Sequence, residues 1–303
     1  MKIVTHDGTF HTDELVAIAL LRKFVLSKNV EIIRTRDEEK IQKYLLDKNV
    51  YVVDVGRKFE ENLKNFDHHQ RSFNEKWEDG IVLSSCGLVW RYIKRRGYLK
   101  KYDRRSIKNI EERIIKKIDL HDNGFGRWTF AHIFSAFNRE NSSMEDFNKA
   151  LEMASYYIEN ILYQEKLNEK NEIIFNNDFD KYQDEEIFFS QISIKNGYLL
   201  KKLANETKAL VFIYKSNEHD DEERWYIKSI KRDFEEQDEP IGALAPENLR
   251  GLSYKVLTEQ TGIKGAVFVH RSGHMAVFKS KKSAVKFANI MIENYHQNFG
   301  HLD

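Results

Sequence analysis

Short runs of β-branched residues alternate with segments of helical spacing through the first 55 residues, and this order restricts the fold most. The runs at 2–5, 30–34 and 50–55 are typical of strands because they are rich in Val and Ile. The segments between them, 12–26 and 37–46, repeat apolar residues at helical spacing behind polar N-terminal residues. Strands that alternate with helices predict an α/β domain, in which a parallel sheet has helices on both faces.

The middle of the chain is predicted to be helical. Helices are expected at 85–96, 106–122 and 144–170, and isoleucines at helical spacing mark the second of them. The third is expected to connect the two halves of the chain. The polar and acidic stretch 171–186 is expected to form a loose boundary behind it.

The second half has the pattern of a smaller α+β domain. Strands are predicted at 209–214, 224–229, 265–269 and 275–279, and a helix is predicted at 282–295. The last two strands are expected to pair through the turn 271–274. We therefore expect an N-terminal α/β domain at 1–145, a helical connector at 146–185 and a C-terminal α+β domain at 186–303.

The composition predicts a cytoplasmic protein without a membrane segment. The longest apolar run, 15–21, is far shorter than the ~20 residues that cross a membrane. No basic leader precedes an apolar stretch, so we expect no export signal. The single cysteine allows no intrachain disulfide, which fits a reducing compartment.

The charge pattern argues against a surface that binds nucleic acid everywhere, because the net charge is only +1. The charge is uneven, however, since residues 90–117 contain twelve Lys and Arg but three acids. This segment is either a local basic face or an ordinary solvated helix surface.

Histidine and aspartate gather where the predicted strands end. Four groups stand out, namely His6 to Glu14, Asp54, Asp67 to Gln70, and Asp119 to Asp122. The first three groups fall where a parallel sheet would present them on one edge, and ligands bind at the carboxyl ends of the strands in such a sheet. Imidazole and carboxylate groups together suit a Mn, Fe or Zn site. Taken singly, each of these residues could instead cap a helix or a turn.

Two of the aspartates occupy positions that are expected to be buried. Asp54 lies within the apolar run 50–55, and Asp122 follows Ile118 by four residues on the isoleucine face. Buried carboxylates are costly, and converging ones repel each other, unless a cation neutralises them. The groups taken together therefore predict a metal site.

Four ordered stretches make this prediction specific. They are Thr5-His6-Asp7-Gly8-Thr9-Phe10-His11-Thr12-Asp13-Glu14, Val52-Val53-Asp54-Val55-Gly56, Asp67-His68-His69-Gln70-Arg71-Ser72-Phe73 and Asp119 to Gly124. Near the C-terminus, Leu249-Arg250-Gly251-Leu252 and Phe268-Val269-His270 belong to the same pattern. The set resembles the melanocyte-proliferating-gene (Myg) family of the DHH phosphoesterase superfamily, over nearly the whole chain.

The resemblance implies a chemistry and a ligand set. The superfamily hydrolyses phosphoester or phosphoanhydride bonds, and a eukaryotic relative is described as a 3′ to 5′ RNA exonuclease. Two Mn-like ions are implied, with Mg, Fe or Zn as alternatives. By analogy one ion would be held by His6, His11 and Asp54, and the other by Asp13, Asp54, His68 and Asp122, with Asp54 as the bridge. Where this chain has His11, the superfamily usually has an aspartate.

The two adjacent histidines are expected to have different roles. Neighbouring side chains of an extended segment point in opposite directions, so only one of the two can readily bind metal. We assign metal binding to His68. His69 is implied to face the substrate, as a phosphate binder or as a general acid, and is the catalytic residue together with Asp54.

Substrate binding is predicted in the C-terminal turn of Arg271, Ser272, Gly273 and His274. Gly273 permits close approach of a backbone, and Arg271 can hold a phosphate through two hydrogen bonds. An exposed turn with incidental charges is the alternative.

The sequence thus predicts a metal-dependent phosphodiesterase, a 3′ to 5′ exonuclease on single-stranded RNA or short oligonucleotides. A phosphohydrolase for pyrophosphate or a bisphosphorylated nucleotide is the second hypothesis, and a non-enzymatic metal- or RNA-binding protein is the third. The complete ligand set argues against the third, and the Myg-type C-terminal region favours the first over the second. The choice between RNA and DNA, and between monomer and homodimer, stays open.

Overall fold

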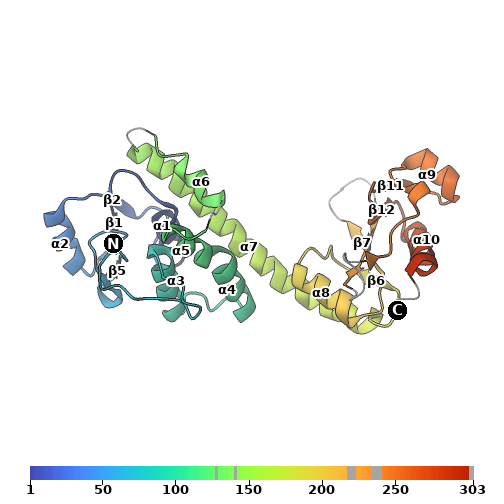
Figure 1. The fold of residues 1–303 in the computed structure, drawn as a ribbon, viewed down its shortest axis with the longest axis horizontal. Coiled ribbons are helices and arrows are strands. Elements are labelled where there is room, and N and C mark those ends of the chain that lie inside the picture. Colours follow the sequence, from blue (N-terminus) through green and yellow to red (C-terminus); the bar gives the residue numbers. More distant parts are fainter. Residues whose placement is uncertain (127–128, 140–141, 217–222, 234–240, 300–303) are drawn as a thin grey trace. The chain divides into compact units, whose positions relative to one another are not determined.

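The structure is a computed structural model that describes residues 1–303 except 127–128, 140–141, 217–222, 234–240 and 300–303 (Figure 1). The chain divides into two compact units, 1–166 and 167–303. Helix α7 (Met144–Tyr182) takes part in both units because the division falls within it. Each unit is built around its own five-stranded sheet.

The sheet of the first unit has the order β2-β1-β3-β5-β4. Its strands are β1 (Lys2–Thr5), β2 (Glu31–Arg34), β3 (Val50–Val53), β4 (Phe59–Glu60) and β5 (Asn65–Phe66). Strand β1 is parallel to β2 and β3, and β3 is parallel to β5, whereas β4 is antiparallel to β5. The carboxyl ends of β1, β3 and β5 are therefore neighbours, and the predicted α/β fold is confirmed.

Helices cover both faces of this sheet. Helix α2 (Glu38–Leu46) packs on the face that carries Val4 and Val52. Helices α1 (Thr12–Phe24) and α3 (Ser85–Arg95) pack on the opposite face, which carries Ile3 and Tyr51. Adjacent strand residues alternate between the two faces, as strand geometry requires. Residues 12–21 of α1 are all buried, so this helix is a rigid support for whatever its N-terminus carries.

The predicted helix at 106–122 is a continuous helical stretch with a change of winding. Helix α4 (Arg104–Ile110) leads into a π-helical segment (Glu111–Ile115), which leads into α5 (Lys116–Asp122). The isoleucine face is buried as predicted, at Ile110, Ile114, Ile115 and Ile118. Helix α6 (Thr129–Ser135) follows α5 and was not predicted.

The second unit has a mixed sheet in the order β11-β12-β8-β7-β6. Its strands are β6 (Ile187–Ser190), β7 (Val211–Ser216), β8 (Arg224–Ser229), β11 (Ala266–Val269) and β12 (Met275–Phe278). Helix α8 (Gly197–Glu206) connects β6 to the parallel strand β7, and α9 (Tyr254–Thr261) and α10 (Lys281–Phe299) complete the unit. A short pair, β9 (Lys231–Arg232) and β10 (Ile241–Gly242), is antiparallel. The predicted pairing of β11 with β12 is confirmed.

The predicted loose boundary at 171–186 is wrong, because α7 continues as a helix to Tyr182. The extra turns are anchored by two buried side chains. Phe175 packs in an apolar cluster with Phe188. Asp178 accepts hydrogen bonds from the backbone N–H of Gln191 at 2.8 Å and from its side chain at 2.9 Å. These anchors lie inside a stretch whose overall polarity suggested a linker. None of the helices in the described ranges is long and apolar enough to cross a membrane.

Candidate metal centre

The loop behind β1 brings the first histidines to the carboxyl edge of the sheet. His6 directly follows β1 and is buried, and His11 begins α1, where its backbone N–H donates to Glu14 Oε1 at 2.9 Å. Two arginines, one at the end of β2 and one just after it, hold this loop. Arg34 donates to the carbonyl oxygens of His6 and Gly8, and Arg36 donates to that of Asp7. The sequence analysis missed both arginines, although one ends and the other follows a strand that pairs with β1.

Asp54 follows β3 in an unusual backbone conformation. Its φ angle is +57°, in the left-handed region that aspartate tolerates better than most residues. Its backbone N–H donates to Phe66 O at 3.1 Å, and its Oδ1 accepts from Ser85 Oγ at 2.9 Å. The strand end and α3 therefore fix the direction of a buried carboxylate.

The first donor group contains His6, His11 and Asp54, whose ligand atoms lie within 4.8 Å of one another. His6 Nε2 is 3.4 Å from Asp54 Oδ2 and 2.9 Å from Glu14 Oε1. Its Nδ1 lies 3.0 Å from Asp7 O. Arg36 Nη2 also lies 3.0 Å from this nitrogen, and a neutral His6 with its proton on Nδ1 would offer the lone pair of Nε2 to a metal.

The second donor group surrounds His68 Nε2. This atom lies 3.2 Å from Asp122 Oδ2, 3.4 Å from Asp54 Oδ1 and 3.9 Å from Asp13 Oδ2. The ligand atoms of His11, Asp13 and Asp122 also lie within 4.8 Å of one another. Because Asp54 Oδ2 faces His6 and Asp54 Oδ1 faces His68, this carboxylate stands between the two groups. The structure thus brings together all six residues that the sequence analysis selected as metal ligands.

Asp13 gives a physical reason for the group to bind a cation. Both of its carboxylate oxygens are buried and have no hydrogen-bond partner among the described residues. Burial raises the pKa of Asp13 well above its ordinary value, and the negative charges of Asp122 and Asp54 raise it further. A divalent cation between these groups removes both costs. The nitrogen and oxygen donors fit a divalent metal such as Mn, Fe or Zn.

Electrostatics between His6 and Asp54 favour the charged forms. Burial alone would lower the pKa of His6, but hydrogen bonds to Asp54 and Glu14 outweigh it and raise that pKa to about 10. Burial alone would raise the pKa of Asp54, but hydrogen bonds with His6 and His68 bring it far below its ordinary range. Asp54 is therefore an anion that attracts cationic partners on both sides.

The prediction that the side chains of His68 and His69 point in opposite directions is wrong. The two imidazole rings lie 4.2 Å apart, and Asp54, His68 and His69 form one donor group. The reason is that β5 ends at Phe66, so the two histidines are not in an extended strand. Asp67 Oδ1 accepts from the backbone N–H of His69 at 3.1 Å and lies 2.7 Å from its Nδ1. The bond to Asp67 raises the pKa of His69, whose side chain is 53% exposed.

A recess of about 260 Å³ opens beside the second donor group. Its lining includes the three potential ligands His11, Asp13 and Asp122. The other lining residues come from the loop behind β1, from α5 and from the region of α6, and they are Thr9, Phe10, Thr12, Ile118, His121, Ala131, Ser135 and Asn138. The metal centre is therefore accessible from a cavity.

The predicted substrate turn belongs to the second unit. It connects β11 and β12, and Gly273 has a φ of +74°. A Cβ atom on Gly273 would lie 2.7 Å from Arg250 Nε, so the turn needs glycine there. Ser272 Oγ lies 2.8 Å from His270 Nδ1. Arg271, Ser272, Gly273 and His274 thus form an ordered turn outside the unit that holds the metal ligands.

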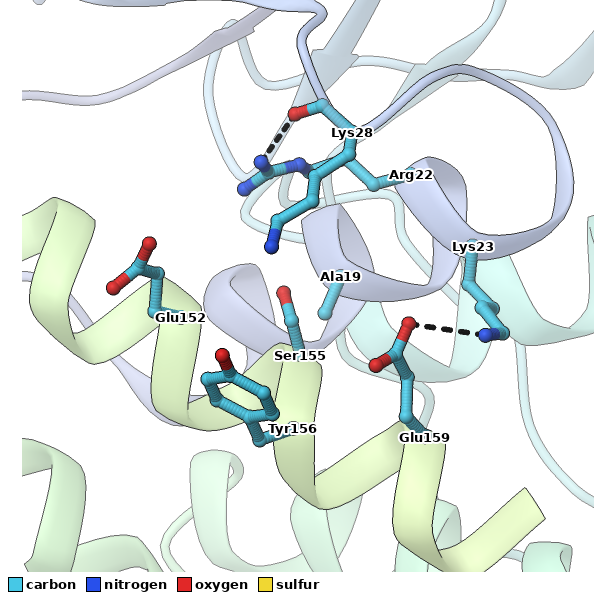
Figure 2. Close-up of a pocket in the computed structure, with 8 residues that line it drawn as sticks. All are labelled: Ala19, Arg22, Lys23, Lys28, Glu152, Ser155, Tyr156 and Glu159. Carbon is cyan, nitrogen blue, oxygen red and sulfur yellow. Dashed lines mark hydrogen bonds and ion pairs between the residues drawn. The ribbon is translucent and has the colours of Figure 1, made fainter. Parts of the chain in front are cut away.

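A separate recess of about 250 Å³ lies at the C-terminal end of α1, against α7 (Figure 2). Lys23 Nζ pairs with Glu159 Oε1 at 3.0 Å, and Arg22 donates to the carbonyl oxygen of Lys28. Glu152 and Tyr156 line the opposite wall. Among the residues that the structure describes, its lining carries no histidine or aspartate, so it lacks the converging donors of the metal centre.

A parallel-sheet domain with His and Asp donors at the carboxyl ends of its strands defines a metal-dependent hydrolase. The model named MYG1_exonuc, described as "Uncharacterised protein family (UPF0160)", matches residues 2–292, so the chain belongs to this family. The predicted resemblance to the Myg family is confirmed. Family membership and the donor set together place the chain among the hydrolases of phosphoester bonds.

Curated relatives match almost end to end. The MYG1 protein of Chlamydia pneumoniae is 28% identical over 97% of both chains. The MYG1 exonuclease of Mus musculus is 26% identical over 95% of this chain and 83% of its own length. Among solved structures, the pGpG-specific phosphodiesterase PggH of Vibrio cholerae matches with a TM-score of 0.30 and 13% identity over 96% of this chain and 97% of that one. A likeness this low assigns no substrate.

Proposed function

We propose that this chain is a two-metal nuclease that removes nucleotides from the 3′ end of single-stranded RNA or short oligonucleotides, with Mn as the preferred ion. The observation that supports this best is the position of Asp54, whose two oxygens face different groups of His and Asp donors. A carboxylate between two donor groups is what a bridged pair of divalent ions requires.

The distances support the division of the ligands between two ions that the family resemblance implies. His6, His11 and Asp54 would hold one ion, and Asp13, Asp54, His68 and Asp122 would hold the other. When bound, such ions lower the pKa of water and offset the charge that develops on the phosphoryl oxygens. The protein itself positions the carboxylates, through Ser85 on Asp54 and through the buried N-terminus of α1 at Asp13.

His69 is proposed to donate the proton that the leaving oxygen needs. Asp67 holds Nδ1 of His69, so Nε2 is the nitrogen that can face a substrate. A positioned acid of this kind contributes roughly 10²–10⁴ to a hydrolysis rate. Among the histidines near Asp54, His69 and His11 are exposed, whereas His6 is buried and His68 is partly buried. The exposure of His69 fits contact with a bound molecule.

Nucleic acid is proposed as the substrate because mammalian relatives in the same family are named exonucleases. Arg271 and the turn around it are proposed to bind a substrate phosphate. Arg271→Ala should then raise the KM for a short RNA and make its salt dependence shallower, because one phosphate contact fewer releases fewer counterions. Unchanged KM at every salt concentration would contradict this role.

The test of the proposed function is a panel of substrates with Mn. Single-stranded RNA and DNA, labelled at either end, would be compared with duplex RNA and with pyrophosphate. We expect stepwise shortening from the 3′ end of single-stranded RNA, and loss of that activity with a chelator. Hydrolysis of pyrophosphate alone would instead identify a small-molecule phosphohydrolase.

A further inference from the structure

We propose that the recess beside Asp122, together with the exposed ring of Phe125, binds the base and sugar of the terminal nucleotide. This inference rests on the proposed function and narrows it to a substrate class, namely nucleic-acid ends whose last base is unpaired. The ligand is a nucleoside unit attached to the phosphate at the metal centre.

The shape and lining of the recess fit such a unit. Its floor is apolar, since Phe10, Ile118 and Ala131 are all at most 3% exposed. One wall carries potential metal ligands, including Asp13 and Asp122, so an occupant of the recess would be adjacent to the reacting phosphate. A flat apolar floor beside polar walls suits a nucleobase and its sugar.

Phe125 comes shortly after the lining residues His121 and Asp122 in the chain and is 67% exposed. It follows Asp122 by three residues, so the two Cα atoms are at most about 11 Å apart. Helix α5 ends in a Schellman motif, because the N–H of Phe125 donates to Leu120 O at 2.8 Å and that of Gly124 donates to His121 O at 3.0 Å. The hydrophobic residue at this position usually packs on its own helix. Here the ring is left in solvent, where it can stack with a base.

His121 supplies a polar contact within the recess. It lines the cavity, and its Nδ1 is buried without a hydrogen-bond partner among the described residues. A sugar hydroxyl or a base edge would give this nitrogen the partner that it lacks. Stacking recognises any base, whereas a duplex keeps its terminal base paired and stacked on its neighbour. The site therefore selects single-stranded ends.

The experiment compares Phe125→Ala with the wild-type enzyme on two Mn-dependent substrates. One is a short single-stranded RNA, and the other is the same RNA with an abasic sugar at its 3′ end. Base stacking supports an effect of roughly tenfold or more. We expect the wild type to have about a tenfold higher KM for the abasic RNA. Phe125→Ala should show that higher KM on both substrates.

Tyr156→Ala is the matched control, because Tyr156 is 61% exposed and lies in the same unit on α7. It should behave like the wild type on both substrates. Equal wild-type KM values for the two RNAs would overturn the inference while leaving the nuclease intact. An equal loss by Phe125→Ala on both RNAs would also overturn it, since the effect would not involve the base. Absence of any oligonucleotide hydrolysis would instead refute the proposed function itself.

Discussion

Asp54 combines three properties that single residues rarely combine. It is buried, its backbone is left-handed, and its two oxygens face different donor groups. The backbone conformation aims the side chain past the end of β3 instead of along the strand. Glycine and asparagine would tolerate this backbone, but only a carboxylate offers two anionic oxygens to two cations.

Asp54→Asn tests the bridging role with little change in shape. Asparagine tolerates the left-handed backbone, so the fold should survive, but the apo protein should lose stability because the Asp54 anion attracts His6 and His68. Manganese affinity should fall by more than the roughly 10–100-fold that a lost outer-sphere contact costs. Calorimetric titration with Mn and thermal unfolding without it are the measurements. Wild-type manganese affinity in the variant would rule out the bridge.

Substitutions of His68 and of His69 should have different effects on metal affinity and turnover, even though the two rings are neighbours. His68→Gln removes the nitrogen that faces three carboxylates, so manganese affinity should fall. His69→Gln removes the proposed acid and should keep the affinity while kcat drops by roughly 10²–10⁴. Titration with Mn and turnover of a short RNA would be measured on both variants. A drop in affinity with His69→Gln alone would reverse the two assignments.

At the scale of elements, α3 and α5 are joined by a buried carboxylate. Asp119 Oδ1 accepts from Ser84 Oγ at 2.6 Å and from the backbone N–H of Ser84 and of Gly87 at 3.0 Å each, and Asp119 Oδ2 accepts from Trp77 Nε1 at 2.6 Å. This arrangement satisfies the N-terminus of α3 and holds α5 one turn before Asp122. The position of Asp122 at the metal centre therefore depends on this helix contact.

Gly87→Ala should break that contact. A Cβ atom at Gly87 would lie 2.2 Å from Asp119 Oδ2, so the helices must move apart, at a cost of about 1–3 kcal/mol in unfolding free energy. Gly197→Ala in α8 is the control, because a Cβ there meets nothing within 4 Å and should be neutral or slightly stabilising. Urea denaturation of both variants is the measurement. Equal stability of the two would contradict the close approach.

Sequence periodicity predicted the elements that repeat regularly and missed those that depend on tertiary contacts. The strands before His6 and Asp54 were evident, because β-branched runs alternate with helical spacing. The π-helical segment at Glu111–Ile115 was not, since its register is set by partners distant in sequence: Trp90 and Lys94 both donate to Glu111 Oε1. Likewise, Arg34 and Arg36 gave no signal as supports of the His6 loop, because side-chain to carbonyl contacts leave no periodic pattern.

Most of the six potential ligands could be selected from the sequence because they lie at the ends of predictable elements, whereas His68 was selected from the Asp67-His68-His69 motif. The division of these ligands into two groups could not be predicted, since it depends on which oxygen of Asp54 faces which histidine. The direction of His69 was predicted wrongly for a related reason. Strand geometry was assumed beyond Phe66, where the Asp67 carboxylate in fact holds His69 and the two imidazole rings lie side by side.

At the scale of the molecule, the first unit is assembled around charges that need neutralising. Asp13 and Asp54 are both buried, and the charges of Asp122 and Asp54 act on Asp13, so the metal-free unit holds Asp13 beside like charges. Binding of divalent ions should therefore stabilise folding as well as support hydrolysis, because only the folded unit presents the donors together. The preformed site therefore lowers the stability of the metal-free fold.

Cys86 provides a direct measure of this linkage, because it is the single cysteine of the chain and is buried within α3. Burial raises the pKa of its thiol well above the ordinary value, and the charge of Asp119 raises it further. The reactive thiolate is therefore scarce in the folded protein, and alkylation should require unfolding of the first unit. Manganese at about 100 times its Kd should slow alkylation roughly 100-fold for each ion that only the folded unit binds, since each such ion stabilises the folded state by that factor. Mass spectrometry of iodoacetamide labelling, with and without a chelator, measures the rate.

Asp54→Asn should lose most of the manganese effect. Rapid labelling of the wild type that is indifferent to manganese would show that metal binding and the folding of this unit are not coupled.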